Sequence, residues 1–301
     1  MIFRTVCALL SGLLVLGQGT RLLAQELEPR SYTNLPTGQT FLAVGIARAE
    51  GDLTLTSTSA LQDAELTVDG LFVGMAHTFA LAGDAAKVDL LGVRYCYQGD
   101  GRFNGEPVDV ERCEYNDPAV RITWNFYGAP ATTLEEFSRI KPGLVVGTSL
   151  QVTAPVGTYH SEHLINAGAN RWVVRPALGM SYVLGDWFID ASTSVRIFGD
   201  NDNYYNGNKL EQDPLYQAEG HLVYNLNKGR WLAFDANYFT GGETSRNGVK
   251  SDDRQENSRL GLTFSTPITA HHSIKLVASR GVMTRVGNKF DIYGIFWQYR
   301  F

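Results

Sequence analysis

The chain ends with Asp291-Ile292-Tyr293-Gly294-Ile295-Phe296-Trp297-Gln298-Tyr299-Arg300-Phe301. Alternate residues of an extended strand share one face, so the apolar face here consists of Tyr293, Ile295, Trp297, Tyr299 and Phe301. Gly294, Gln298 and Arg300 lie on the opposite face. A terminal phenylalanine preceded by alternating aromatics resembles the C-terminal signal that the bacterial outer-membrane insertion machinery reads. We therefore predict a final membrane strand whose assembly signal is Trp297, Tyr299 and Phe301.

The same period of two recurs through the preceding chain. Residues 216–226, for example, read YQAEGHLVYNL. No stretch beyond the first two dozen residues has about 18 consecutive apolar residues, so we expect no transmembrane helix there. Twelve alternating runs are predicted as strands, at about 39–50, 67–80, 87–98, 117–127, 143–155, 171–184, 187–199, 214–226, 231–242, 256–266, 272–285 and 289–301.

The connections between these runs alternate in length. Long ones lie near 51–66, 99–115, 157–170, 200–213 and 243–254, and short ones near 81–86, 185–186, 227–230 and 267–271. Two depart from the alternation, 128–142 and 286–288. An even number of strands with short turns at one end and long loops at the other is typical of an outer-membrane barrel. A soluble β-sandwich also alternates, but it has no need to end on an amphipathic strand. We predict an all-β, closed, antiparallel transmembrane β-barrel of about 12 strands over 39–301.

The long connection between the fourth and fifth strands shows helical spacing. Leu134, Phe137 and Ile140 recur every three residues, and Thr132 with Glu135 matches a capping box. We expect a short periplasmic helix there, which either covers apolar strand ends as a lid or docks a partner.

The first residues belong to a different class of sequence. Arg4 precedes an apolar run, and small residues lead to a plausible cleavage site after Ala24. We interpret residues 1–24 as a signal peptide in preference to a buried first helix, and 25–38 as a periplasmic N-terminal segment. Loss of Arg4 and Arg21 leaves 24 basic against 31 acidic residues, a net charge of −7.

Two cysteines, Cys96 and Cys113, follow the signal peptide. Zinc prefers four ligands, and no CxxC motif or nearby histidine pair completes a set, so we expect no metal site. An exported protein meets an oxidising compartment, and the even number of thiols therefore predicts a disulfide that closes one exposed loop.

Alternation also places polar side chains inside the barrel, where each needs water or a partner. The inward charged residues predicted are Arg121, Arg175, Arg196, Arg259, Lys275 and Arg300 against Asp190, Glu219 and Asp235, with His221, Asn125, Asn237 and Gln298 beside them. From these we predict a lumen lined by Arg121, Arg175, Arg196, Glu219, His221, Asp235, Asn237 and Arg259. Its positive excess would favour anions or electron-rich rings. Twelve strands leave space for a channel, but paired charges could also close it, and both alternatives stay open.

Charge limits the classes of partner. The net charge of −5 over the whole chain disfavours nucleic acid, which needs a basic surface. The five long loops carry sixteen acidic and six basic residues. They either are solvated or meet divalent cations that bridge lipopolysaccharide. We expect as partners the lipids and lipopolysaccharide of the outer membrane, the barrel insertion machinery and a small solute.

Five short stretches carry a family resemblance: 117–121 (DPAVR), 165–172 (INAGANRW), 212–216 (QDPLY), 252–255 (DDRQ) and 297–301 (WQYRF). Together they resemble the family named for a MetA pathway of phenol degradation, over most of the chain from about Asn34 to Phe301. The resemblance implies a Gram-negative outer-membrane barrel of transporter type, associated with uptake of aromatic or other apolar compounds. It implies no catalytic residues.

An outer-membrane hydrolase is one alternative to a channel, and a structural or adhesive barrel is another. A hydrolase needs a nucleophile and an oriented base, and the only local candidate is 160–163, which reads HSEH. Asp200 with Asp202, and Asp252 with Asp253, offer carboxylate pairs that are more typical of solvated loops. Phosphate-loop, dinucleotide and zinc motifs are absent from the sequence, so we expect no cofactor and no enzymatic activity. We predict a porin-like channel for passive uptake of small solutes.

Deletion of Phe301 is expected to impair assembly, because the terminal aromatic residue belongs to the predicted insertion signal. Immunoblots of outer-membrane fractions should show less folded barrel, whereas transport per assembled molecule should stay unchanged. Normal outer-membrane levels of the truncated protein would contradict this assignment.

Overall fold

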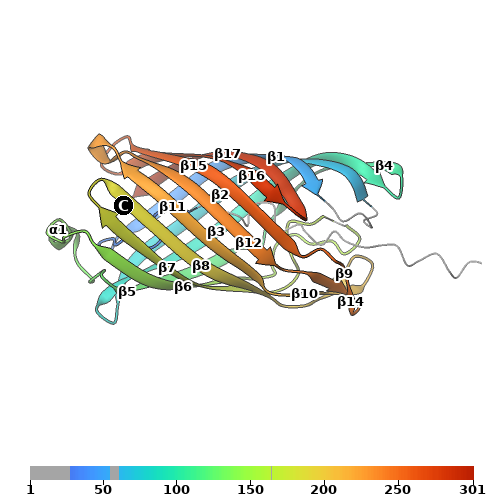
Figure 1. The fold of residues 1–301 in the computed structure, drawn as a ribbon, viewed down its shortest axis with the longest axis horizontal. Helices are drawn as coiled ribbons and strands as arrows, with labels where there is room; N and C mark the ends of the chain where they lie inside the picture. The colour runs from blue at the N-terminus through green and yellow to red at the C-terminus, as the bar shows by residue number, and fades with distance from the viewer. Residues whose placement is uncertain (1–27, 55–60, 164) are drawn as a thin grey trace, which may run out of the picture.

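The computed structural model describes residues 28–54, 61–163 and 165–301 (Figure 1). The expected signal peptide, 1–24, lies outside the described residues. Within these ranges, no helix has the length and hydropathy needed to cross a membrane.

The wall of the protein consists of twelve antiparallel strands in a single ring. The first six are β1 (Thr40–Thr54), β2 (Leu61–Leu81), β3 (Asp84–Phe103), β5 (Ala119–Tyr127), β6 (Leu144–Thr153) and β7 (Val173–Leu184). The other six are β8 (Trp187–Phe198), β11 (Leu215–Asn225), β12 (Trp231–Gly241), β15 (Gln255–Pro267), β16 (His272–Thr284) and β17 (Gly287–Arg300). Because β1 pairs with both β2 and β17, the sheet closes on itself. The predicted closed barrel of twelve strands is confirmed.

Several long connections are strands, and here the prediction of loops was wrong. β4 (Glu106–Tyr115) pairs with β3 in line with β5, and four short strands form a separate sheet. These are β9 (Asn201–Tyr204), β10 (Asn208–Gln212), β13 (Thr244–Arg246) and β14 (Val249–Lys250). Three of the hairpins turn at Asn-Gly pairs, 104–105, 206–207 and 247–248, with positive φ at both residues. Such pairs favour the two-residue turns that match strand twist, so this signal was present in the sequence.

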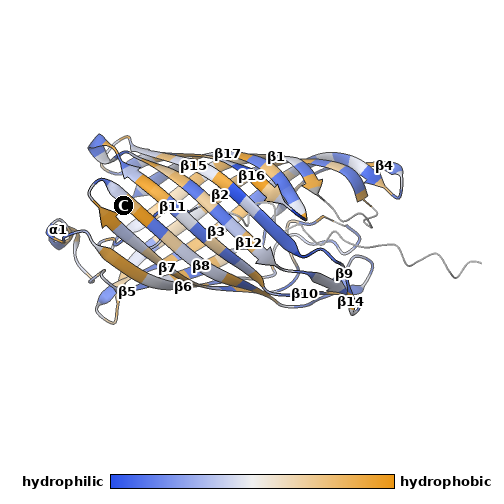
Figure 2. Ribbon diagram, viewed as in Figure 1, coloured by the Kyte–Doolittle hydropathy of each residue, from blue (hydrophilic) through white to orange (hydrophobic). Residues whose placement is uncertain are grey.

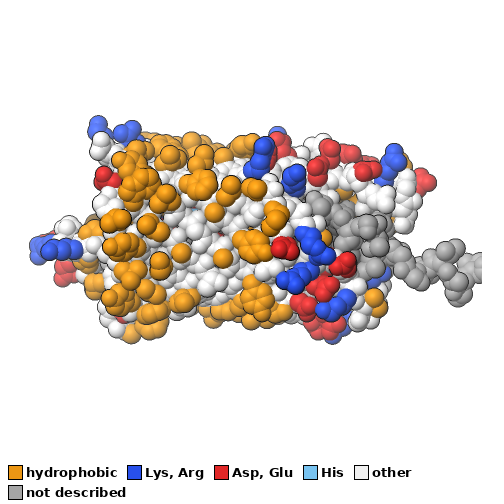
Figure 3. All heavy atoms as spheres, viewed as in Figure 1, with side chains coloured by type: hydrophobic (Ala, Val, Ile, Leu, Met, Phe, Trp, Pro, Cys, Tyr) orange, Lys and Arg blue, Asp and Glu red, His pale blue; other side chains and the backbone are white. Residues whose placement is uncertain are grey.

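The outer surface of the barrel carries a broad apolar band (Figures 2 and 3). Side chains alternate across the wall: Ile46 is 60% exposed on the outside, whereas its neighbour Ala47 is 7% exposed on the inside. Charged side chains gather mainly at the end with β4, β9 and β14, and ion pairs such as Arg48–Asp69 mark that edge of the band. An uncharged band between polar ends is typical of a barrel wall that faces lipid.

Several aromatic residues near the strand ends lie on this outer surface, as in an interfacial girdle, but Trp231 does not. Trp187, Tyr238 and Trp297 are exposed. Trp231 instead lies on the inner side, where the guanidinium carbon of Arg30 is 5.8 Å from its ring centroid. Trp231 shares its face of β12 with Ala233 and Asp235, which are buried on the inner side, so the alternation along the strand places it inside.

The short helix α1 (Leu134–Phe137) lies at the end of the barrel with the short turns. Its capping box joins Thr133 to Glu136, one residue later than the predicted pair Thr132 and Glu135. The backbone carbonyl of Thr132 instead accepts a hydrogen bond from the Thr37 amide at 2.8 Å. No helix residue is buried and Leu134 is 50% exposed, so α1 does not cover the strand ends as a lid.

Cys96 of β3 and Cys113 of β4 form a disulfide across directly paired positions. It joins the two strands of the hairpin at the end of the barrel opposite α1. The predicted pairing is therefore present, although it ties two strands together and does not close an irregular loop.

Protein purified without reductant should contain no titratable thiol after unfolding. Replacing both cysteines by serine should destabilise the hairpin by roughly 3 kcal/mol, because the bond closes a loop of 17 residues in the unfolded chain. Thiol titration in denaturant and chemical unfolding curves measure the two effects. Two reactive thiols in the wild-type protein would refute the pairing.

Candidate functional site

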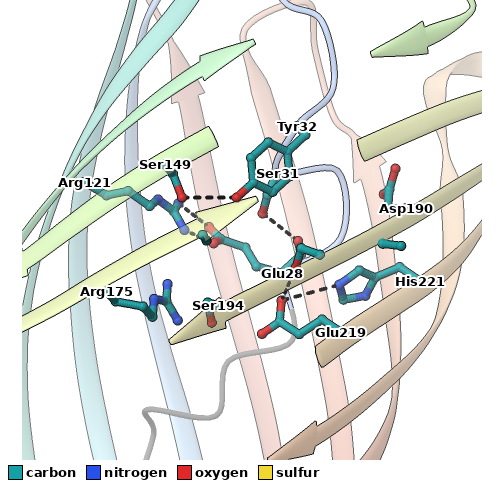
Figure 4. A pocket seen from close by; sticks show the side chains of 13 residues that line it. Glu28, Ser31, Tyr32, Arg121, Ser149, Arg175, Asp190, Ser194, Glu219 and His221 are labelled. Carbon is teal, nitrogen blue, oxygen red and sulfur yellow. Dashed lines mark hydrogen bonds and ion pairs between the residues drawn. The ribbon is translucent and has the colours of Figure 1, made fainter. Parts of the chain in front are cut away.

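The described part of the N-terminal segment lies inside the barrel, although the sequence placed 25–38 in the periplasm. Tyr32 is buried against the inner wall, and its hydroxyl is 3.1 Å from Ser149 Oγ of β6 (Figure 4). The backbone N–H of Arg30 donates to Asp190 Oδ2 of β8 at 2.8 Å. The end of the segment that leads into β1 is fixed by hydrogen bonds from the amides of Thr37 and Gly38 to the carbonyls of Thr132 and Thr78, respectively. Residues 28–38 therefore occupy the lumen at the end with the short turns.

Space for the Tyr32 ring comes from missing side chains on β6 and β7. Gly147 and Gly179 are paired in register on these strands. A Cβ atom on Gly179 would lie 2.1 Å from a Tyr32 ring carbon. Only glycine lets the inner wall approach the ring this closely, so these two positions form a seat for the segment.

Arg121 of β5 holds the other end of this segment. Its guanidinium donates to both carboxylate oxygens of Glu28, at 2.5 and 3.0 Å, and to Asp89 Oδ2 at 3.1 Å. Enclosure in the barrel acts to raise the pKa of Glu28. The charge and hydrogen bonds of Arg121 outweigh this effect of burial and hold the pKa of Glu28 below its usual range. Glu28 is therefore ionised at neutral pH and paired with a cation of the wall.

A small polar cavity of about 40 Å³ remains beside the segment. By volume it holds only a few water molecules. Its charged lining residues are Glu28, Arg121, Arg175, Asp190, Glu219 and His221 (Figure 4). Three carboxylates thus face two guanidinium groups and one imidazole, and the positive excess predicted from alternation is not found around this cavity. The set of inward charged residues predicted from the sequence omitted Glu28 and Asp89, which both pair with Arg121.

The predicted lumen residues fall into two groups. A first group is joined by hydrogen bonds along the polar inner wall. Arg175 donates to Gln151 at 2.9 Å, and His221 Nδ1 is 2.7 Å from Asp235, whose other oxygen accepts from Thr263. Asn237 Nδ2 lies 3.4 Å from Glu219.

Arg259 and Arg196 form the second group, and neither side chain lines the small cavity. Arg259 is buried in the wall, where it donates to the Phe290 carbonyl at 2.9 Å. Arg196 lies opposite Leu215 near the outer end of β8, away from the small cavity.

The opposite inner wall is apolar, which the sequence analysis missed. Phe72, Tyr95, Tyr97, Phe290 and Ile292 are buried there on β2, β3 and β17, and Phe296 packs against them. The Phe72 ring lies edge-on to both Tyr95 and Phe296, with centroids 6.3 and 5.6 Å away. A signal existed, because 71–73 (Leu-Phe-Val) and 295–297 (Ile-Phe-Trp) are continuous apolar runs, as expected for strands with apolar side chains on both faces.

The outer connection 154–172 folds over the barrel end and is held by buried acids. Asp117 accepts hydrogen bonds from the amides of Gly157 and Ala169 at 2.8 and 2.7 Å, and Glu114 accepts one from Ala167 at 3.0 Å. Burial raises the pKa of Asp117, whereas these amide donors act to lower it. Ala167 itself packs into the apolar wall.

Four of the five stretches that carry the family resemblance meet at this end, whereas the fifth, 297–301, lies at the end with the short turns. Arg171 donates to Gln212 at 2.5 Å, and Gln212 donates to the Gly242 carbonyl at 2.9 Å. Asp253 accepts from the backbone and hydroxyl of Thr244 at 2.6 and 2.9 Å. These residues therefore shape the outer connections of the barrel.

The only local candidate for a hydrolase is part of the same folded connection. Asn166 binds the backbone of His160 and His163, so its side chain sets the turn at 160–163. His160 Nδ1 lies 3.8 Å from Glu162. Among the described residues no hydrogen bond joins Ser161 to a histidine, and no group of three potential metal ligands is found. The arrangement supports a structural turn and gives no triad geometry.

Comparison with solved structures matches the whole barrel. An outer membrane channel from Pseudomonas putida F1 is 21% identical with a TM-score of 0.76, over 92% of this chain and 100% of that one. The transport unit of the autotransporter AIDA-I from Escherichia coli is 11% identical with a TM-score of 0.55, over 95% and 96%. The translocator domain of the autotransporter NalP from Neisseria meningitidis is 12% identical with a TM-score of 0.50, over 94% and 95%. At these identities the likeness concerns the fold, which is that of outer-membrane barrels.

Comparison with protein families identifies the sequence group. The model of the family described as "Putative MetA-pathway of phenol degradation" matches residues 120–301, more than half of the chain. The protein belongs to this family.

Proposed function

We propose that this protein is a channel of the bacterial outer membrane that takes up small aromatic or other apolar compounds passively. The observation that carries the proposal is the division of the lumen into two walls. The apolar wall, formed by Phe72, Tyr95, Tyr97, Phe290 and Phe296, faces a wall of hydrogen-bonded polar groups. A solute with a ring and a polar substituent finds partners on both sides.

The comparisons support the same function. The Pseudomonas putida protein that shares the fold is an outer membrane channel, and the family is named for phenol degradation. The apolar outer band supports a location in the membrane, with the strand ends near α1 in the periplasm and β4, β9 and β14 outside. The signal peptide expected at 1–24 and the insertion signal expected at Trp297, Tyr299 and Phe301 would agree with export to this membrane.

The small cavity favours a second candidate, a structural barrel without conductance. With residues 28–38 in place, the cavity of about 40 Å³ beside them is too small for an aromatic solute. Passage through this part of the lumen therefore requires that the segment moves within the lumen or leaves it. The Glu28–Arg121 pair, the Tyr32–Ser149 hydrogen bond and the hydrogen bond from the Arg30 N–H to Asp190 hold the segment, and none of them belongs to the barrel sheet, so its displacement leaves every strand of the barrel paired.

Glu28→Gln is expected to increase conductance and solute flux several-fold, because it removes the ion pair with Arg121. Recordings in planar bilayers and swelling of liposomes with phenol measure the two effects. Glu136→Gln on the exposed helix α1 is the matched control and should leave both unchanged. Absence of conductance in the wild type and in Glu28→Gln would favour the structural barrel.

Arg175→Gln should shift ion selectivity towards cations, because Arg175 is one of two guanidinium groups around the cavity and it donates its hydrogen bond to the neutral side chain of Gln151. Reversal potentials across a salt gradient measure this shift. The control Arg139→Gln removes an exposed cation beside α1 and should leave the reversal potential as in the wild type. Equal reversal potentials for Arg175→Gln and the wild type would place this residue off the ion path.

A further inference from the structure

A second, larger cavity lies at the outer end of the barrel, and none of the predicted lumen residues lines it. Its volume is about 260 Å³. It lies against the extended part of β1, β2, β3 and β4, and the connections that carry His163, Ile165 and Tyr205 border it on the other side. We refer to it as the outer cleft.

The lining of the outer cleft is largely apolar. Leu61 and Ala64 are buried beside it, with Leu53 and Phe103 packed against them. Val108 and Val110 of β4 contribute from the disulfide-linked hairpin. Arg112 donates to the carbonyl of Ile165, which fixes the connection 154–172 against this hairpin. The cleft is thus built from elements that are tied together.

The size and shape of the outer cleft suit a single aromatic ring. A cavity of roughly 150 Å³ with aliphatic and aromatic walls is enough to bind benzene. The outer cleft therefore has room for one ring with a substituent. Apolar walls stabilise such a ring by removing its surface from water.

The charges around the outer cleft disfavour anions. Four acidic residues border it, Glu65, Asp100, Asp109 and Glu162, and the one arginine, Arg112, is already paired with Glu114 at 3.1 Å. Burial lowers the pKa of His163, and the charge of Arg112 adds to this effect, so its imidazole is neutral at neutral pH. Carboxylates within a Debye length, about 8 Å at physiological salt, repel a bound anion.

The outer cleft is continuous with the apolar wall of the lumen. Val110 packs on the cluster that contains Leu66, Tyr97 and Phe72, and that cluster extends down to Phe296. A ring that leaves the cleft along this wall stays in contact with apolar side chains.

We propose that the outer cleft is a capture site for a small neutral aromatic molecule with one polar substituent, such as phenol, and that it rejects aromatic carboxylates. The inference rests on the proposed function, since it supplies the step before passage through the lumen. Capture at the outer end raises the local concentration of solute where the lumen begins.

Calorimetric titration of the full mature protein in detergent tests the site, with phenol and benzoate as the probes. Phenol is expected to bind saturably, and benzoate at least tenfold more weakly. Val108→Trp fills the cleft from a residue that is 39% exposed, so folding should be retained. It should weaken phenol binding at least tenfold, and Val110→Asp should do the same by adding a carboxylate. Val249→Trp, at a residue 62% exposed on β14 outside the cleft, is the matched control and should bind as the wild type does.

Unchanged phenol affinity in Val108→Trp would overturn the site, and equal binding of phenol and benzoate would overturn its charge preference. Flux of phenol into liposomes separates this inference from the proposed function. Flux with the same half-saturation in Val108→Trp and wild type would refute capture and leave the channel intact. Phenol binding that Val108→Trp abolishes, without flux in any variant, would support the cleft and refute the channel.

Discussion

The pairing of β1 with β17 is the constraint on which the rest of the structure depends. A hydrocarbon environment offers no partner to a backbone N–H or C=O group, so each must be paired within the protein. Registered pairs from Phe41 with Arg300 to Thr54 with Gly287 meet this need at the only place where the sheet could remain open. Closure then assigns every other side chain to the lipid or to the lumen, and this is why a period of two dominates the sequence.

The lipid-facing side of the barrel wall is easier to predict from the sequence than the lumen-facing side. The lipid side is uniform in chemistry, so alternation alone is enough to assign Leu150, Leu178 and Leu262 to the outside, where the structure shows them exposed. The lumen side is not uniform. Polar residues such as His221 and Asp235 were recognisable among apolar neighbours, but Phe72 and Phe296 were not, because they continue the apolar character of the outer face. A pattern of period two identifies an inner face only where the two faces differ.

Contacts between distant parts of the chain lay beyond such patterns. Glu28 and Arg121 are far apart in the sequence, and a periplasmic location for residues 25–38 was a reasonable inference from local composition alone. Asp89 could have been found, since it alternates with the exposed Leu90 on a predicted strand. The outer hairpins could have been found as well, because their Asn-Gly turns are local features. The seat of Tyr32 could not, since two glycines on neighbouring strands become a site only when a ring from elsewhere covers them.

The N-terminal segment is covalently joined to β1, and this sets how it can act on the lumen. Residues 28–38 are attached a few residues before Thr40, so they behave as a tethered ligand of their own barrel. A short tether gives an effective concentration in the millimolar range, whatever the number of barrels in the membrane. Occupancy of the lumen by this segment is therefore a unimolecular equilibrium. A diffusing solute competes with it only by reaching a comparable concentration at the same place.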